Sequence, residues 1–447
     1  MDNRISVKHF RHKGEEHTSP VVVFILFALC LLIAIPVSIT LGIVAVLPGV
    51  FDPSFTASAS YVIRSMVGGI DSFPLLAVPM FVLAGILMAR GQISKRLFDV
   101  FSYFLGKRTA GIPCAVIITC LFYGAISGSA PATVAAVGSM TIPLLIDMGY
   151  DKVFSTAIVA VAGGLGVIIP PSIPFIMYAM ASGASVSDLF LAGIVPGVLI
   201  GFLLMAYAFV YCKRHGEDRE KIDSQIKVLH DKGFFKVFKE SFFAILSPVI
   251  VLGCIYSGVA SPTEAAVISV FYSLIISMFI YKTLKFKDLW AILTEAMKTY
   301  APIMFILAAS TAFSRVLTLM QVPQMVSAFI LENFTNKVIL LLVINFFLLI
   351  VGMVMDTTPA ILILSPILLP IVTAVGVNPI HFGVVMVVNL AIGFVTPPIG
   401  VNLFVASSLT EVPVMEIAKK AMPMIIMFLI ALLLITYIPA ISLCLLG

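Results

Sequence analysis

The sequence predicts an all-α polytopic membrane protein with inverted repeats, and three observations lead to this fold class: the composition, the long apolar runs and an internal duplication. Of the 447 residues, 61% are hydrophobic and 11% are charged, and the mean hydropathy is +1.15. A soluble domain carries about 25% charged residues, so the composition excludes a water-soluble enzyme, a nucleic-acid-binding protein and a disordered chain. The apolar runs have the length of membrane-spanning helices and lack the alternation of a transmembrane barrel.

The N-terminal part predicts a polar segment followed by a first membrane span. Residues 1–20 form the polar segment, and the apolar run from Val21 to Leu47 is too long for the hydrophobic region of a cleaved signal peptide. We therefore expect a retained first span. Further apolar runs follow at 73–89, 111–147, 153–180, 189–212, 242–259, 265–281, 301–318, 338–375, 379–407 and 421–446.

Two of these runs predict re-entrant helical hairpins. Each of 111–147 and 338–375 is long enough for two crossings, but small polar residues and proline interrupt it near the middle. Lys and Arg gather in alternate loops, which the positive-inside rule places in the cytoplasm. This sorting holds only if both runs turn back to the side from which they entered. The runs 153–180 and 379–407 contain Gly and Pro and predict broken helices.

The polar segments predict surface structure. Residues 213–240 are rich in Lys, Asp and Glu and predict a cytoplasmic connector. Residues 92–106 mix charged and aromatic side chains, as expected of an amphipathic helix along the membrane surface, and 285–299 look similar.

The internal duplication predicts two copies of one unit, at 21–212 and 241–447. Proline-proline occurs only twice, at 170–171 and 397–398, and 397 − 170 = 227. The extra crossing at 265–281 makes the copies begin from opposite sides, and inverted repeats with broken helices are typical of secondary transporters. Further pairs at the spacing of 227 are Pro143 and Pro370, Gly149 and Gly376, Gly166 and Gly393, and Pro196 and Pro423, while Pro131 and Pro359 are 228 apart.

The hairpin turns and broken helices predict two cation sites. The first hairpin turns at 127–131 (Ser-Gly-Ser-Ala-Pro) and the second at 355–359 (Met-Asp-Thr-Thr-Pro). A centred Asp costs about 3 kcal/mol in a membrane, and Gly and Pro leave helix carbonyls without donors. Such oxygens can replace the water around a sodium ion, because hard cations prefer oxygen ligands. The alternative is a kink in which Ser and Thr bond to the backbone.

Other candidate residues carry simpler interpretations. Arg315 is a candidate ligand for a substrate carboxylate, and the alternative is that it snorkels to the membrane surface. Ser261 and Glu264 form a capping box with Pro262 at the first helical position, so we interpret Glu264 as structural. The cysteines form no CxxC pair, and only His381 of the histidines lies near a span, which disfavours zinc and haem.

At these residues the chain resembles the large membrane subunit of tripartite ATP-independent periplasmic (TRAP) transporters, within the ion-transporter superfamily. The resemblance extends from about residue 70 to about residue 425. The motifs that carry it are AISGS at 125–129, IPPSIP at 169–174, LAGIVPG at 191–197, PTEAA at 262–266, GMVMD at 352–356 and TPPIG at 396–400.

The resemblance implies a scaffold and an elevator-type transport domain that contains both hairpins and is driven by sodium. The implied sodium ligands are Ser127, Ser129, Gly164 and Val167 at one site, and Asp356, Thr357, Gly393 and Thr396 at the other. The expected substrate contacts are Ser129, Ala130, Thr358, Pro359 and Arg315.

The resemblance also implies a location, partners and cargo. The chain is expected in a bacterial inner membrane, with a small four-helix membrane subunit and a periplasmic substrate-binding protein as partners. The implied cargo is a small organic acid, sialic acid or a C4-dicarboxylate. We expect Na⁺ as the coupling ion, no nucleotide, haem or zinc, no nucleic-acid partner and no enzymatic activity; no GxxxxGK[ST] sequence is present.

Two alternatives remain open from the sequence. One is a stand-alone Na⁺/carboxylate symporter of the same superfamily, which would transport without a binding protein. The other is a structural or electron-transfer subunit of a membrane complex, against which the lack of paired histidines within the spans argues.

Overall fold

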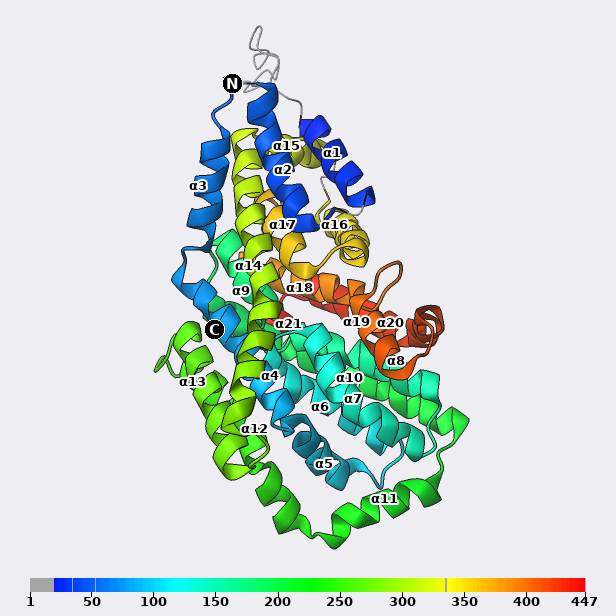
Figure 1. The fold of residues 1–447 in the computed structure, drawn as a ribbon. Coiled ribbons are helices and arrows are strands. Elements are labelled where there is room, and N and C mark those ends of the chain that lie inside the picture. The colour runs from blue at the N-terminus through cyan, green and yellow to red at the C-terminus, as the bar shows by residue number, and fades with distance from the viewer. Residues whose placement is uncertain (1–19, 34, 53, 334–335, 447) are drawn as a thin grey trace.

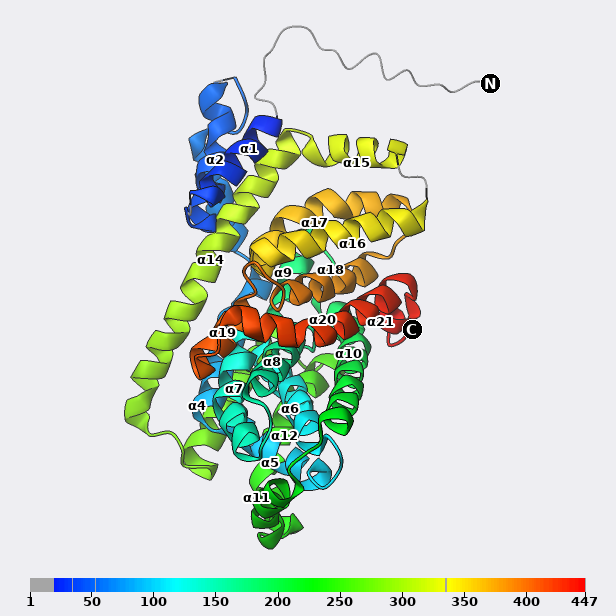
Figure 2. The same ribbon diagram turned by 90° about the vertical axis from the view of Figure 1, so that its right-hand side faces the viewer.

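The computed structural model describes residues 20–33, 35–52, 54–333 and 336–446. The first 19 residues of the predicted polar segment lie outside the described residues. The described elements are all helical, and nine of the described helices are long and apolar enough to cross a membrane. The chain is thus a multi-pass membrane protein, as the composition predicts. Figure 1 shows the order of the helices, and Figure 2 shows them from the side.

The N-terminal run folds differently from the predicted single span at 21–47. It forms two helices, α1 (Pro20–Leu32) and α2 (Val37–Phe51), which pack against each other. The prediction of one span was wrong because Pro36 disfavours helical backbone in the residue before it. A third helix, α3 (Ala59–Ile70), follows α2, and Ser58 caps it by accepting a hydrogen bond from the backbone N–H of Tyr61.

The longest helix, α14 (Leu289–Leu319), connects the two ends of the molecule. Its 31 residues correspond to about 46 Å, and Figure 2 shows it running along one side of the other helices. It packs against α2, α3, α4 (Ala77–Arg90) and α17 (Thr357–Ala374). The expected separate surface helix at 285–299 was wrong: residues 286–288 form a short 3₁₀ turn and α14 begins directly after it.

Three further helices pack around α4 and the first hairpin. The predicted amphipathic helix at 92–106 is α5 (Ile93–Leu105), and its apolar face packs against α6 (Gly111–Ser127) and α12 (Phe234–Tyr256). The helix α12 (Phe234–Tyr256) leads to α13 (Pro262–Ile275), which continues as a π-helical turn over 276–280. The predicted capping box is confirmed: Ser261 Oγ accepts from the Glu264 N–H at 3.3 Å, and the Glu264 carboxylate accepts from the Ser261 N–H at 2.8 Å.

Both predicted hairpins form as pairs of helices separated by two residues. The first consists of α6 (Gly111–Ser127) and α7 (Ala130–Asp147), and the second of α16 (Lys337–Val354) and α17. Proline and small polar residues at the turns end one helix and begin the next. The helices of each pair contact each other.

Both predicted broken helices are also interrupted at their Gly and Pro residues. The first consists of α8 (Lys152–Ala162), a 3₁₀ segment η3 (Gly163–Val167) and α9 (Ile173–Ser182). The second consists of α18 (Pro379–Gly393) and α19 (Val401–Thr410). The remaining described helices are η2 (Phe73–Leu76), α10 (Val186–His215), α11 (Arg219–Asp231), α15 (Val322–Asn333), α20 (Val414–Tyr437) and α21 (Ala440–Leu443).

The same backbone contact recurs in the two copies, between a hairpin and its broken helix. A Cβ on Gly124 would lie 2.6 Å from Gly166 Cα, and a Cβ on Gly393 would lie 2.2 Å from the carbonyl carbon of Gly352. The corresponding glycines are 352 − 124 = 228 and 393 − 166 = 227 residues apart, which matches the spacing of the duplicated prolines. Only glycine permits this close approach, which fixes each hairpin against its unwound segment.

The connector is attached to the first hairpin through a buried carboxylate. The Glu217 side chain is 3% exposed and accepts hydrogen bonds from the Ala110 N–H at 3.0 Å, the Tyr150 hydroxyl at 2.6 Å and Arg219 at 2.6 Å. Arg219 also donates to the carbonyls of Lys107 and Arg108. Burial and the hydrogen bond to Glu217 raise the pKa of Tyr150, so its hydroxyl remains a donor at neutral pH.

We expect Glu217→Ala to destabilise the protein by about 3 kcal/mol, because it leaves three donors, one of them charged, without their acceptor. The measurement is the thermal denaturation midpoint of the purified protein in detergent. Glu220→Ala is the matched control, since Glu220 is exposed on α11. Equal midpoints for the two variants would contradict the proposed anchoring role of Glu217.

Candidate functional site between the hairpin tips

The first hairpin tip is built by hydroxyl and carbonyl groups that pack on the unwound segment η3. Gly128 has φ +60°, and a Cβ there would lie 2.8 Å from Pro171 O, so glycine is required at this turn. The Ser127 hydroxyl lies 3.0 Å from the Thr133 hydroxyl, and Thr133 donates to Ser129 O at 2.8 Å. The Ser129 hydroxyl has no hydrogen-bond partner in the part of the chain that the structure describes.

The second hairpin tip places a carboxylate at the start of α17. Asp356 Oδ1 accepts from the Thr358 N–H at 3.0 Å and from the Thr357 hydroxyl at 3.3 Å, which makes Asp356 the N-cap of the helix. The side chain is exposed, and its second oxygen accepts no hydrogen bond from any described residue. A free carboxylate oxygen is therefore available to a ligand.

The two tips line one cavity, although they are more than 200 residues apart in the sequence. The cavity has a volume of about 110 Å³. Its polar lining is a carboxylate and hydroxyls, with no cationic side chain among the residues that line it. The lining residues are Gly128, Ser129, Pro131, Val167, Ile173, Pro174, Ile303, Ile306, Asp356, Thr357, Thr358 and Phe394.

A larger cavity adjoins the first. It has a volume of about 510 Å³ and shares Ser129, Pro131, Ile173 and Ile303 with the smaller one. Its lining also includes an ion pair between Arg90 at the end of α4 and Glu295 on α14. The Lys-rich segment that precedes α14 places this end on the predicted cytoplasmic side.

The structure brings together part of each predicted sodium site. In the first site Ser129 and Val167 line the small cavity, and the buried Ser127 lines the larger one. In the second site Asp356 and Thr357 line the small cavity.

The other predicted sodium ligands lie behind this lining. Gly164 lines neither cavity, and a Cβ there would lie 3.6 Å from Phe428 Cε2 and 3.8 Å from Ala391 O. Gly393 contacts Gly352, and the Thr396 hydroxyl donates to Ile392 O at 2.7 Å. Neither Gly393 nor Thr396 is among the residues that line the cavity.

Of the predicted substrate contacts, some line the small cavity and others do not. Ser129 and Thr358 line the small cavity, whereas Ala130 and Pro359 are buried in the first turns of α7 and α17. Arg315 lines a separate cavity with Gly68, Gly69 and Ser72. The structure therefore does not place Arg315 beside the hairpin tips.

Sequence reasoning missed the contribution of α14 to both cavities. Glu295, Thr299 and Ile303 line the larger cavity, and Ile303 and Ile306 line the smaller one. Their spacings of four, four and three residues place them on one face of a helix. That periodicity could have identified a shared face, but no signal in the sequence indicates that this face contacts the hairpins.

This fold is that of a polytopic helical membrane transporter. A solved structure with a similar fold is the YdaH transporter of Alcanivorax borkumensis, with a TM-score of 0.63, 14% identity and coverage of 93% of this chain and 98% of that one. MtrF of Neisseria gonorrhoeae is similar at a TM-score of 0.62, with 14% identity and 95% of each chain covered.

The chain belongs to the family of the tripartite ATP-independent periplasmic transporter, DctM component, whose pattern matches residues 24–441. It is the large membrane subunit of a TRAP transporter, as the sequence motifs predict.

Relatives with different substrates in their names are similar to the chain. The isethionate TRAP transporter permease protein DctMQ of Oleidesulfovibrio alaskensis is 45% identical over 94% of this chain, which spans 65% of that protein's length. The C4-dicarboxylate TRAP transporter large permease DctM of Pseudomonas aeruginosa is 39% identical over 84% of this chain and 86% of its own. The sialic acid permease SiaM of Vibrio cholerae is 34% identical over 86% and 88%.

Proposed function

We propose that the chain imports a small organic anion together with sodium ions across a bacterial inner membrane. The observation that carries this proposal is the cavity in which the Ser129 tip of one hairpin and the Asp356 tip of the other meet. Its small volume and single carboxylate suit a partly dehydrated cation, because sodium takes oxygen ligands and a negative charge offsets the loss of hydration.

The cargo is proposed to occupy the adjoining cavity of about 510 Å³, which lies within the usual range for small-molecule sites. Helices α7 and α17 begin at the two tips, and helix N-termini attract anions. Sodium bound nearby would add further positive charge. The relatives named for isethionate, C4-dicarboxylates and sialic acid suggest a cargo with a carboxylate or sulfonate group.

The proposed mechanism moves the hairpins and broken helices as one body against a scaffold that includes α14. The paired glycine contacts that fix each hairpin to its broken helix support such a rigid unit. At 100 mV, two sodium ions entering with one monoanion move one net charge, worth about 2.3 kcal/mol. Each tenfold sodium ratio adds roughly 1.4 kcal/mol per ion, so the ion gradient is a sufficient energy source.

The proposed partners are a small four-helix membrane subunit and a periplasmic substrate-binding protein, as the tripartite family name suggests. Both are needed to test the function. The experiment is uptake of labelled isethionate, succinate or sialic acid into proteoliposomes that contain both membrane subunits and receive the binding protein on the outside. We expect uptake only with an inward sodium gradient and only with the binding protein.

Two outcomes would contradict the proposal. Uptake that persists when the sodium gradient is replaced by a potassium gradient would exclude sodium coupling. Uptake without the binding protein would favour the stand-alone symporter.

A further inference from the structure

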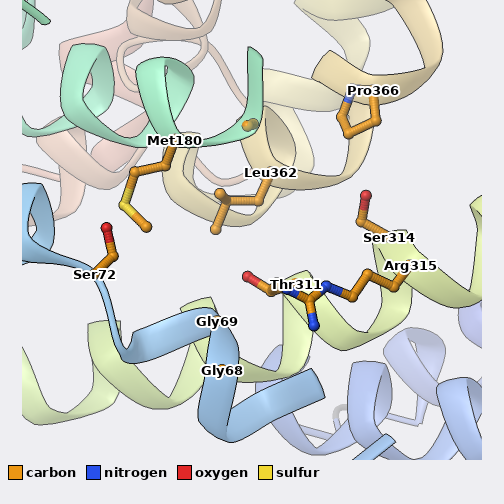
Figure 3. Close-up of a pocket in the computed structure, with 10 residues that line it drawn as sticks. Gly68, Gly69, Ser72, Met180, Thr311, Ser314, Arg315, Leu362 and Pro366 are labelled. Carbon is orange, nitrogen blue, oxygen red and sulfur yellow. The ribbon is translucent and has the colours of Figure 1, made fainter. Parts of the chain in front are cut away.

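The cavity that contains Arg315 is separate from the hairpin tips and has a different character. It has a volume of about 290 Å³ and is lined by residues of α3, α9, α14 and α17. Figure 3 shows the Arg315 side chain extending along α14 beside Thr311, with Gly68 and Gly69 of α3 close by. The full lining is Gly68, Gly69, Ser72, Met180, Ala181, Thr311, Ser314, Arg315, Leu362 and Pro366.

Position along α14 separates the two sites. Arg315 and Ile303 are 315 − 303 = 12 residues apart, which is about 18 Å along a helix axis. Glu295, at the predicted cytoplasmic end, is 315 − 295 = 20 residues away, or about 30 Å. The Arg315 cavity therefore lies toward the predicted periplasmic side.

The polar side chains of this cavity have no hydrogen-bond partners among the described residues. In the described part of the chain, the Arg315 guanidinium makes no hydrogen bond or ion pair. The same holds for the hydroxyls of Ser72, Thr311 and Ser314. No Asp or Glu is among the residues that line the cavity. A positive charge surrounded by free hydroxyls is complementary to an anion.

Two glycines of α3 lie beside Arg315 and Thr311 of α14. A Cβ on Gly68 would lie 3.8 Å from Arg315 Nη1, and a Cβ on Gly69 would lie 2.7 Å from Thr311 Cβ. The second contact holds α3 against α14, so that Ser72, just beyond the end of α3, faces the same cavity as Arg315. The Arg315 side chain is exposed and forms part of the lining of this recess, so its guanidinium is open to a ligand that enters it.

We propose that this recess is a second anion site, which holds the carboxylate or sulfonate group of the cargo on the periplasmic side before the cargo reaches the hairpin tips. This inference rests on the proposed function. The charges of the two sites support it: the small cavity contains the Asp356 carboxylate and suits a cation, whereas the recess contains Arg315 and suits an anion. A volume of about 290 Å³ holds a small organic acid, since a water molecule occupies about 30 Å³.

The test is uptake by the complete transporter with Arg315→Gln. We expect the half-saturating concentration of isethionate, succinate or sialic acid to rise by about tenfold to a hundredfold, since a charged hydrogen bond is lost. The half-saturating sodium concentration should not change. Arg315→Lys should restore part of the loss, because it keeps the charge and loses the planar guanidinium. The matched control is Arg64→Gln, since Arg64 is exposed on α3 and does not line the recess.

A binding measurement separates this inference from the proposed function. Purified wild-type protein should gain thermal stability from the organic anions, and Arg315→Gln should reduce that gain whether or not uptake depends on sodium. The inference is overturned if Arg315→Gln behaves like Arg64→Gln in both assays. It is also overturned if inorganic sulfate stabilises the wild type as well as the organic anions do, because the recess would then be a general anion site.

Discussion

Asp356→Asn is expected to weaken the activation of uptake by sodium strongly while leaving the protein folded. Asparagine keeps the oxygen that accepts the Thr358 N–H and is as good an N-cap as aspartate, so α17 should begin at the same residue. The charge that faces the cavity is lost. An ion pair at about 4 Å in an effective dielectric constant of about 20 is worth about 4 kcal/mol. We expect the half-saturating sodium concentration to rise by at least about a hundredfold.

The measurement is uptake in proteoliposomes at a series of sodium concentrations. Asp223→Asn is the matched control. Asp223 is exposed on α11 in the connector and does not line the cavity, so this substitution makes the same chemical change at a different place. Asp356→Ala should lose both the charge and the cap, and should therefore also lower thermal stability. An unchanged sodium response in Asp356→Asn would show that the carboxylate does not bind the coupling ion.

Gly393→Ala is expected to destabilise the protein strongly. The new Cβ would lie 2.2 Å from the Gly352 carbonyl carbon. Because backbone cannot rotate away as a side chain can, α16 and α18 must move apart. Overpacking of this kind costs about 3 kcal/mol. The shift would also displace the second hairpin tip, since Asp356 follows Gly352 by four residues, so we expect uptake to fall together with the thermal denaturation midpoint.

Gly253→Ala is the matched control for this change. Gly253 lies within α12, and a Cβ there would meet nothing within 4 Å. Alanine favours a helix interior over glycine by about 1 kcal/mol, so this variant should keep or slightly raise the midpoint. A Gly393→Ala protein as stable as Gly253→Ala would show that the glycine contact does not hold the hairpin in place.

Local signals account for the parts of the fold that the sequence predicts well. The hairpins, broken helices and capping box lie where Gly, Pro, Ser and Asp interrupt apolar runs, because these residues change the backbone at their own position. The same local reasoning failed at residues 21–47, where Pro36 divides the apolar run, and at 285–299, where nothing separates the polar segment from the start of α14.

The candidate site was only partly predictable for a different reason. The tips were identified from their polar residues, but the sequence does not show which oxygens face a cavity: Ser129 and Asp356 do, whereas the Thr396 hydroxyl bonds to its own helix. The pairing of Arg90 with Glu295 joins residues 205 positions apart. No periodicity or motif indicates that pairing.

The sequence by itself determined the class of protein and the places where helices break, because apolar length, glycine and proline act through the local backbone. Only the tertiary structure decided that the two hairpin tips share one small cavity and that Arg315 lines a different one. Both facts depend on how α14 packs against helices that are distant in the sequence. That packing is set by contacts such as those of Gly69 with Thr311 and Gly352 with Gly393.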